Sequence, residues 1–325
     1  MKFNMEYLLF LIGFILLWKG ADYFIDGGIK LASILGVSPL FIGLSIAAIG
    51  TSAPEAAVSI NAAVIDHSTI SFGNILGSNI ANIGLVIGLG ALLFTISGKS
   101  TTIKKEIPYS LFITLILLFL LRDDWFGGNI QILTRLDGFI LIVFFILYLL
   151  YLYHMAISDR RKLLLDRNLK SIRYSKKETL KTSFLTTGGI IGVLFGAKLV
   201  VDNAVNIALS LGISETMISV TIIALGTSLP EMATSIQAAR KGESDIALGN
   251  IVGSNLFNIL FVLGVTSIIK PIQFSLIAFT DLIIVVLITV ILLIFIFTGK
   301  IITRREGAIL LLFYLFYIVF VIFRR

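Results

Sequence analysis

The sequence predicts an all-α polytopic membrane protein with ten transmembrane helices, arranged as two inverted five-helix repeats. Of its 325 residues, 57% are hydrophobic and only 14% are charged, which is more apolar surface than a single soluble core can bury. Many stretches reach about 20 apolar residues, the length that crosses the hydrocarbon core of a bilayer as a helix. The strand alternation of an outer-membrane barrel is missing, and two polar motifs each occur twice.

The first apolar stretch is expected to be a retained helix. Residues Tyr7 to Leu17 lack a small-residue cleavage site and continue into Lys19 and Asp22, unlike a signal peptide. Hydropathy and its breaks then place the other spans. The ten expected helices cover residues 5–27, 37–64, 71–96, 106–121, 135–156, 182–209, 213–239, 245–268, 274–298 and 306–323.

A basic segment separates the spans into two sets of five. Residues 158–181 form the longest polar stretch and contain nine Lys or Arg residues. We therefore divide the chain into a first five-helix repeat (1–157), a basic cytoplasmic linker (158–181) and a second, inverted repeat (182–325).

Two motifs indicate that the halves are copies of each other. Gly50-Thr-Ser-Ala-Pro-Glu55 returns as Gly226-Thr-Ser-Leu-Pro-Glu231. Similarly, Gly73-Asn-Ile-Leu-Gly-Ser-Asn79 returns as Gly249-Asn-Ile-Val-Gly-Ser-Asn255. Both copies follow the originals by 176 residues, and a shared offset over both motifs indicates duplication. Because each copy has an odd number of spans, the second enters the membrane from the opposite face, as in many secondary transporters.

Loop charge predicts the orientation. The basic linker and the links that hold Lys104, Arg240 and Arg304 are expected on the cytoplasmic side, where Lys and Arg collect. Both termini then face outward, with Arg324 and Arg325 as one discordant feature. Topology thus explains the net charge of +7, and we exclude nucleic acid as a partner. The expected location is the inner or plasma membrane, with the lipid bilayer as surroundings and no obligatory protein partner.

Glu55 and Glu231 are the first candidate functional residues. Each lies near the middle of a span, where an unpaired charge costs several kcal/mol. Each follows two hydroxyl residues on the same helical face and a proline that frees backbone carbonyls. The preceding residues are Thr51, Ser52 and Pro54 in the first copy, and Thr227, Ser228 and Pro230 in the second.

The third and eighth spans add amide and hydroxyl oxygens. These residues are Asn74, Ser78, Asn79 and Asn82, and then Asn250, Ser254, Asn255 and Asn258. Glycines at positions 73, 77, 249 and 253 are expected to let these helices approach their neighbours closely.

The ligand types indicate a site for hard cations. The chain contains no cysteine, which excludes disulfides and thiol catalysis, and its two histidines lie outside the motifs. An all-oxygen set suits Ca²⁺ or Na⁺ better than zinc, copper or nickel. We expect these ions as transported substrates and no prosthetic group.

The paired motifs resemble the two alpha-repeats of the cation/calcium exchanger superfamily, in its prokaryotic sodium/calcium exchanger branch. The resemblance spans both repeats and nearly the whole chain. It implies that Glu55, Glu231 and the carbonyls of Thr51 and Thr227 hold Ca²⁺. It also implies sodium ligands, the last two of them in a central site: Ala48, Ser52, Ser78, Ala224, Ser228, Ser254, Asn82 and Asn258.

Two features bear on the coupling ion. Sodium/calcium exchangers often carry Asp at one of the positions held here by Asn82 and Asn258, which leaves the ion stoichiometry open. Proton-coupled relatives have a glutamate where Gly77 and Gly253 stand, which disfavours proton coupling.

The expected function is secondary active transport that exchanges sodium for calcium by alternating access. Both ions would compete for a midplane site around Glu55 and Glu231. A Ca²⁺/H⁺ antiporter or another cation exchanger is the nearest alternative. A cation channel and an intramembrane protease that uses two acidic residues represent other classes. The many cation-ligating oxygens disfavour the protease, so the chain is expected not to be an enzyme.

The remaining charges near span ends are interpreted as interfacial. Lys198 and Asp202 have the i,i+4 spacing of a helical ion pair. The other members of this group are Asp22, Asp26 and Asp281.

Overall fold

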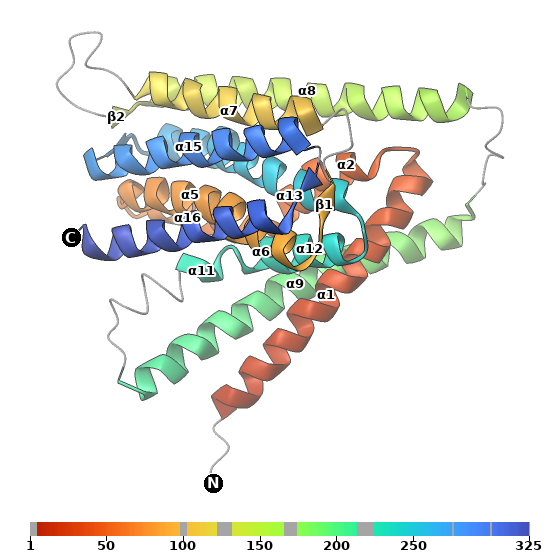
Figure 1. Cartoon of the computed structure of the whole chain (residues 1–325), viewed down its shortest axis with the longest axis horizontal. Helices are drawn as coiled ribbons and strands as arrows, with labels where there is room; N and C mark the ends of the chain where they lie inside the picture. Colours follow the sequence, from red (N-terminus) through yellow and green to blue (C-terminus); the bar gives the residue numbers. More distant parts are fainter. Residues whose placement is uncertain are drawn as a thin grey trace.

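The structure is a computed structural model that describes residues 5–97, 103–121, 132–165, 174–212, 224–274, 276–299 and 301–324. Helices make up most of this part of the chain, and many of them lie side by side (Figure 1). Four two-residue strands form two short antiparallel pairs between links. These strands are not among the elements expected from the sequence.

The first repeat begins with a long helix and continues through helices that are interrupted near their centres. Its elements are α1 (Met5–Leu35), α2 (Pro39–Ile42), the π-helical segment η1 (Gly43–Ala47), α3 (Ala48–Thr51), α4 (Ala53–Val64), α5 (Ser68–Ala81), the π-helical segment η2 (Asn82–Ile87), α6 (Gly88–Leu93), β1 (Ile96–Ser97), α7 (Ile103–Leu120), β2 (Ile132–Leu133) and α8 (Arg135–Leu165).

The second repeat follows the same plan. Its elements are α9 (Lys176–Ser210), α11 (Ala224–Gly226), α12 (Leu229–Arg240), α13 (Ser244–Phe257), the π-helical segment η5 (Asn258–Leu263), α14 (Gly264–Ile269), β3 (Ile272–Gln273), α15 (Leu276–Gly299), β4 (Ile301–Ile302) and α16 (Arg304–Phe323). From α12 to β3, each element begins and ends 176 residues after its counterpart in the stretch from α4 to β1. The duplication seen in the sequence is therefore a duplication of local structure.

Within the described residues, seven helices are long and apolar enough to cross a membrane, and the bent stretch from Pro39 to Val64 makes an eighth. The fourth and seventh predicted spans have counterparts in α7 and in α11 with α12. Residues 213–223 of the seventh predicted span lie outside the described residues. This arrangement fits the predicted ten-helix membrane protein.

The helices beside the basic linker are longer than predicted. α8 runs to Leu165 and α9 begins at Lys176, so the predicted linker 158–181 is helical at both ends. A capping box explains the early start of α9: Glu178 N donates to Ser175 Oγ, and Ser175 N donates to the Glu178 carboxylate, which satisfies two free donors of the helix end. Residues 166–173 of the linker lie outside the described part.

The central spans are the stretches α5–α6 and α13–α14. In their most apolar windows, 78% and 83% of the residues are buried, against 17% for α8. Their aliphatic side chains, among them Ile75, Ile80 and Leu256, belong to one hydrophobic core shared by both repeats. The two spans with the most amide residues therefore lie at the centre of the bundle, with the apolar outer helices around them.

Links from both repeats gather at two opposite faces. At the face near the linker, which we call the linker face, β1 pairs with β4, and Ser38 N donates to Asp159 Oδ2. At the opposite C-terminal face, β2 pairs with β3, and Lys270 Nζ lies 2.8 Å from Asp66 Oδ1. Figure 1 shows β2 and the C-terminus at one end of the horizontal helices and β1 at the other. The described links thus lie together in the two groups that loop charge predicts.

α1 and α9 cross antiparallel along a seam of glycines and run diagonally past the other helices (Figure 1). A Cβ atom on Gly196 would lie 2.3 Å from Leu17 N, and one on Gly20 would lie 2.6 Å from Val193 N. Backbones approach this closely only where a side chain is missing. The seam therefore fixes glycine at these positions.

Gly188 and Gly189 allow a matched test of the seam. A Cβ on Gly189 would lie 2.5 Å from Phe24 N, whereas a Cβ on Gly188 meets nothing within 4 Å. We expect Gly189→Ala to destabilise the protein by about 1–3 kcal/mol, the usual cost of overpacking, and Gly188→Ala to leave it unchanged or slightly stabilised. Thermal melting in detergent measures both. Equal melting temperatures for the two variants would contradict the described seam.

Candidate ion-binding site

Glu55 and Glu231 occupy the first turns of α4 and α12, where the second and seventh spans are interrupted. α3 ends at Thr51 and α4 begins at Ala53, with an angle of 46° between the two halves of the span. Pro54 follows at once, and proline cannot continue the helical hydrogen bonds. The interruption brings the carboxyl-bearing turns to the centre of the bundle.

Both carboxylates are buried and lie near each other. Glu55 and Glu231 are each 0% exposed, and they are close enough for their charges to repel. Ser52 Oγ donates to Glu231 Oε1 at 2.9 Å. The sequence predicts that Thr51, Ser52 and Glu55 share one helical face. The structure differs, because the helix is interrupted between Thr51 and Ala53 and Ser52 contacts the carboxylate of the other repeat. The two motifs thus meet in one place.

Asparagines of α5, η2, α13 and η5 form a crossed network beside the carboxylates. Asn82 Nδ2 donates to Asn255 Oδ1 at 3.0 Å, and Asn258 Nδ2 donates to Asn79 Oδ1 at 3.2 Å. The Nδ2 atoms of Asn79 and Asn255 each donate to the main-chain carbonyl of the other residue at 3.4 Å. Asn82 and Asn258 also begin the two π-helical segments, a local irregularity that is common at functional sites.

This network occupies the amide N–H donors of these asparagines, so several nearby oxygen atoms remain without a regular hydrogen bond. Among the described residues, seven buried side-chain oxygens around the carboxylates make no hydrogen bond of ordinary length and angle, although the Thr227 and Ser78 hydroxyls lie near enough to Glu55 to interact with its carboxylate. They are Glu55 Oε1 and Oε2, Glu231 Oε2, Asn82 Oδ1, Asn258 Oδ1, Thr227 Oγ1 and Ser228 Oγ. A buried acceptor without a donor is costly, and several such oxygens around two carboxylates are what a hard cation requires.

The predicted flanking groups differ between the repeats. Near Glu231, Ser254 Oγ donates to the Ala48 carbonyl at 3.4 Å, and Ser52 donates to the carboxylate. Near Glu55, the matching Ser228 Oγ has no partner among the described residues, and Ser78 lines a cavity. Ala224 is the first residue of α11. The matching serines are buried in both copies, but their hydrogen bonds differ.

The glycines of the central spans also differ between the repeats. A Cβ on Gly253 would lie 2.7 Å from Ala48 Cβ, and one on Gly249 would lie 3.1 Å from Gly43 Cα. A Cβ on Gly73 or Gly77 would meet nothing within 4 Å. The expected close helix contact is therefore confirmed for Gly249 and Gly253 and wrong for the other two, which line a cavity of about 190 Å³ between α5, α15 and α16.

Asn74 and Asn250 make equivalent contacts between helices. Asn74 Nδ2 donates to Ser59 Oγ, and Asn250 Nδ2 donates to Ser235 Oγ, both at 3.0 Å. Asn250 Oδ1 also accepts a hydrogen bond from Thr51 Oγ1 at 3.2 Å. These amides tie α5 to α4 and α13 to α12, next to the carboxylates.

Comparison with known proteins agrees with this geometry. A family model described as sodium/calcium exchanger protein matches residues 5–154 and 182–323. The chain belongs to the sodium/calcium exchanger family. Sodium/calcium exchanger MaX1 of Methanosarcina acetivorans is 34% identical over 97% of this chain and 98% of its own length. Inner membrane protein YrbG of Escherichia coli is 36% identical over 81% of this chain and 79% of its own length.

A solved structure shows the same fold. The sodium-calcium exchanger NCX_Mj, soaked with 10 mM Na⁺ and no Ca²⁺, superposes with a TM-score of 0.82 at 32% identity, over 97% of this chain and 98% of that one. The predicted family and the all-α membrane fold are confirmed. Because members of this exchanger family are transporters, the prediction that the chain is not an enzyme is confirmed as well.

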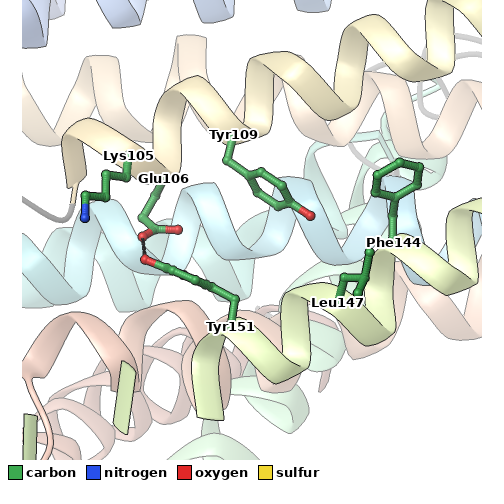
Figure 2. Close-up of a pocket in the computed structure, with 6 residues that line it drawn as sticks. All are labelled: Lys105, Glu106, Tyr109, Phe144, Leu147 and Tyr151. Carbon is green, nitrogen blue, oxygen red and sulfur yellow. Dashed lines mark hydrogen bonds between the residues drawn. The ribbon is translucent and has the colours of Figure 1, made fainter. Parts of the chain in front are cut away.

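The exchanger has a second cavity that the sequence analysis missed. It measures about 320 Å³ and lies between α7 and α8. Figure 2 shows Glu106 of α7 pointing toward Tyr151 of α8, whose hydroxyl donates to the carboxylate. Glu106 is only 2% exposed. The sequence feature that could have indicated this site is an acidic residue in the first turn of a very apolar helix. None of the predicted ion ligands lines this cavity, so it is separate from the site around Glu55.

The unpartnered oxygens predict that Ca²⁺ stabilises the exchanger. A ligand that binds only the folded state adds about 2.7 kcal/mol at a concentration of 100 Kd, so the melting temperature in detergent should rise as Ca²⁺ is added. Mg²⁺ should have a smaller effect at the same concentration and ionic strength, because it requires shorter bonds and loses its water reluctantly. A melting temperature that stays flat over the Ca²⁺ titration would count against a cation site here.

Proposed function

We propose that the chain is a sodium-driven calcium antiporter whose two ions compete for one site near the middle of the membrane, between Glu55 and Glu231. The observation that carries the proposal is the group of buried oxygens without regular hydrogen bonds, drawn from both inverted motifs around the two carboxylates. Two carboxylates neutralise one Ca²⁺, and surrounding carbonyl, amide and hydroxyl oxygens complete the shell that this ion prefers. The family of the chain supports the choice of ions.

Each predicted ligand has a role in this proposal. Glu55 and Glu231, with the carbonyls of Thr51 and Thr227, hold Ca²⁺. Sodium ions occupy flanking positions and a central one formed by the two asparagines of the π-helical segments. The sodium ligands are Ala48, Ser52, Ser78, Ala224, Ser228, Ser254, Asn82 and Asn258.

Alternating access is supported by a difference in packing between the two copies of the glycine-containing motif in α5 and α13. Gly253 lies against Ala48, while Gly77 borders a cavity toward the C-terminal face. Inverted repeats that exchange these two packings would close one side of the site and open the other. The described conformation is then the state that is open toward the C-terminal face.

Competition for the same carboxylates couples the two ions, since neither fills the site while the other is bound. If more than two Na⁺ exchange for one Ca²⁺, each cycle moves net charge across the membrane. We further propose that the protein lies in the cell membrane with its linker face toward the cytoplasm and both termini outside. The chain then divides into repeat 1–157, linker 158–181 and repeat 182–325, with lipid as its surroundings.

Replacement of either carboxylate tests the site. We expect Glu55→Gln and Glu231→Gln each to lower sodium-driven ⁴⁵Ca²⁺ uptake into proteoliposomes at least about 100-fold, because loss of one partner from a buried charged group costs about 3–5 kcal/mol. Asp202→Asn is the matched control: it makes the same chemical change at a side chain that is 53% exposed and paired with Lys198, and it should transport normally.

The choice of gradient tests the coupling. Ca²⁺ uptake should follow an outward sodium gradient and should not follow a potassium or proton gradient of the same size. Uptake driven by the proton gradient, with sodium having no effect, would identify a Ca²⁺/H⁺ antiporter instead. Normal transport by both glutamine variants, recovered as monodisperse protein, would refute the site assignment.

A further inference from the structure

The cavity beside Gly73 and Gly77 has a charged pair in its opposite wall. Ser78 borders it on the side of the proposed site, and Asp281 of α15 and Arg324 at the end of α16 border it on the other. A Cβ on either glycine would meet only open space, so no side chain of α5 fills the cavity at these two positions. The cavity therefore places Ser78 and the charged pair on one continuous space.

The pair itself is tightly held. Arg324 Nη1 and Nη2 donate to the two carboxylate oxygens of Asp281 at 2.5 and 2.8 Å, the two-pronged geometry that strengthens such contacts. The Arg324 side chain is 19% exposed and the Asp281 side chain 6%, and the guanidinium lies 5.3 Å from the centre of the Phe320 ring. Both residues lie near the ends of their spans, as the sequence predicts for Asp281, and the carboxylate is buried against its partner.

The place of both residues in the fold is unusual. Asp281 lies in the first turns of α15, the most apolar of the candidate spans in the described residues, and a buried acidic side chain is costly there without a partner. Arg324 is the charge that did not fit the predicted orientation. A contact that only fastened α16 to α15 would need neither charge, because apolar residues of similar size usually serve as well.

We propose that Asp281 is an outer cation-binding carboxylate on the route to Ser78 and Glu55, and that Arg324 is a tethered counter-ion which an entering cation displaces. Carboxylate oxygens are ligands that Na⁺ and Ca²⁺ share. Arginine does not lose its proton, so it leaves Asp281 only by moving its side chain, and Arg324 follows the last helical residue, Phe323. The pair would thus set the apparent affinity for ions arriving from the C-terminal face.

This inference rests on the proposed antiport, and the test separates the two. The measurement is the KM for Ca²⁺ in sodium-driven exchange, with Ca²⁺ presented to each face in turn in right-side-out and inverted membrane vesicles. Arg324→Gln removes the counter-ion of Asp281 and should lower the KM at the C-terminal face roughly three- to tenfold. Asp281→Asn leaves the arginine alone and should raise it by a similar factor, while the double variant returns close to the wild-type value.

Salt and a matched control complete the test. Both shifts should shrink as ionic strength rises, because screening weakens the charge effect. Arg304→Gln removes one exposed charge at the other end of the same helix and should leave the KM at the C-terminal face unchanged.

Opposite shifts in KM support the proposal, whereas a purely structural pair predicts lower melting temperatures with unchanged KM. If Asp281→Asn is not recovered as folded protein, Arg324→Gln decides alone, because only the proposal predicts a lower KM. Wild-type vesicles without sodium-driven exchange would overturn the proposed function. Wild-type exchange with an unchanged KM in Arg324→Gln would overturn this inference alone.

Discussion

The burial of two carboxylates inside an apolar bundle is the constraint on which the rest of this structure depends. Glu55 and Glu231 are shielded from bulk solvent, and the surrounding amides direct their Nδ2 donors to other asparagines. The oxygen atoms that remain make the site favourable for a bound cation and costly when empty. The interrupted spans help to compensate the buried charges, because a broken helix places polar backbone groups and short hydroxyl side chains around the acidic pair.

Equal sequences occupy unequal environments in the two repeats. Gly249 and Gly253 pack against η1 and α3, whereas Gly73 and Gly77 border a cavity. In the proposed alternating access, the two halves would exchange these packings, so that the other half takes the closed one. Bound ions would then decide which arrangement is populated.

Much of this organisation was predictable from the sequence, because its signals are local or repeated. The spans follow from apolar length, the repeat from the constant 176-residue offset, and the grouping of links from charge. The early start of α9 was readable in Ser175 and Glu178, whose spacing is that of a capping box. The two-residue strands, the cavity at Gly77 and the pair of Asp281 with Arg324 were not predictable. They depend on which distant segments meet. The glycine positions are the same in both motifs, so the sequence does not indicate which copy packs against a neighbouring helix and which borders a cavity.

The strand pairs at the two faces have a consequence for the origin of the chain. β1 pairs with β4 and β2 with β3, so each pair joins one repeat to the other, and the crossed asparagines do the same at the centre. A lone half would leave the strand edges unpaired at the two faces and the central amides exposed to lipid, where they have no substitute partners. The single-copy ancestor implied by the duplication is thus best understood as a homodimer of oppositely inserted subunits, which gene fusion later made into one polypeptide.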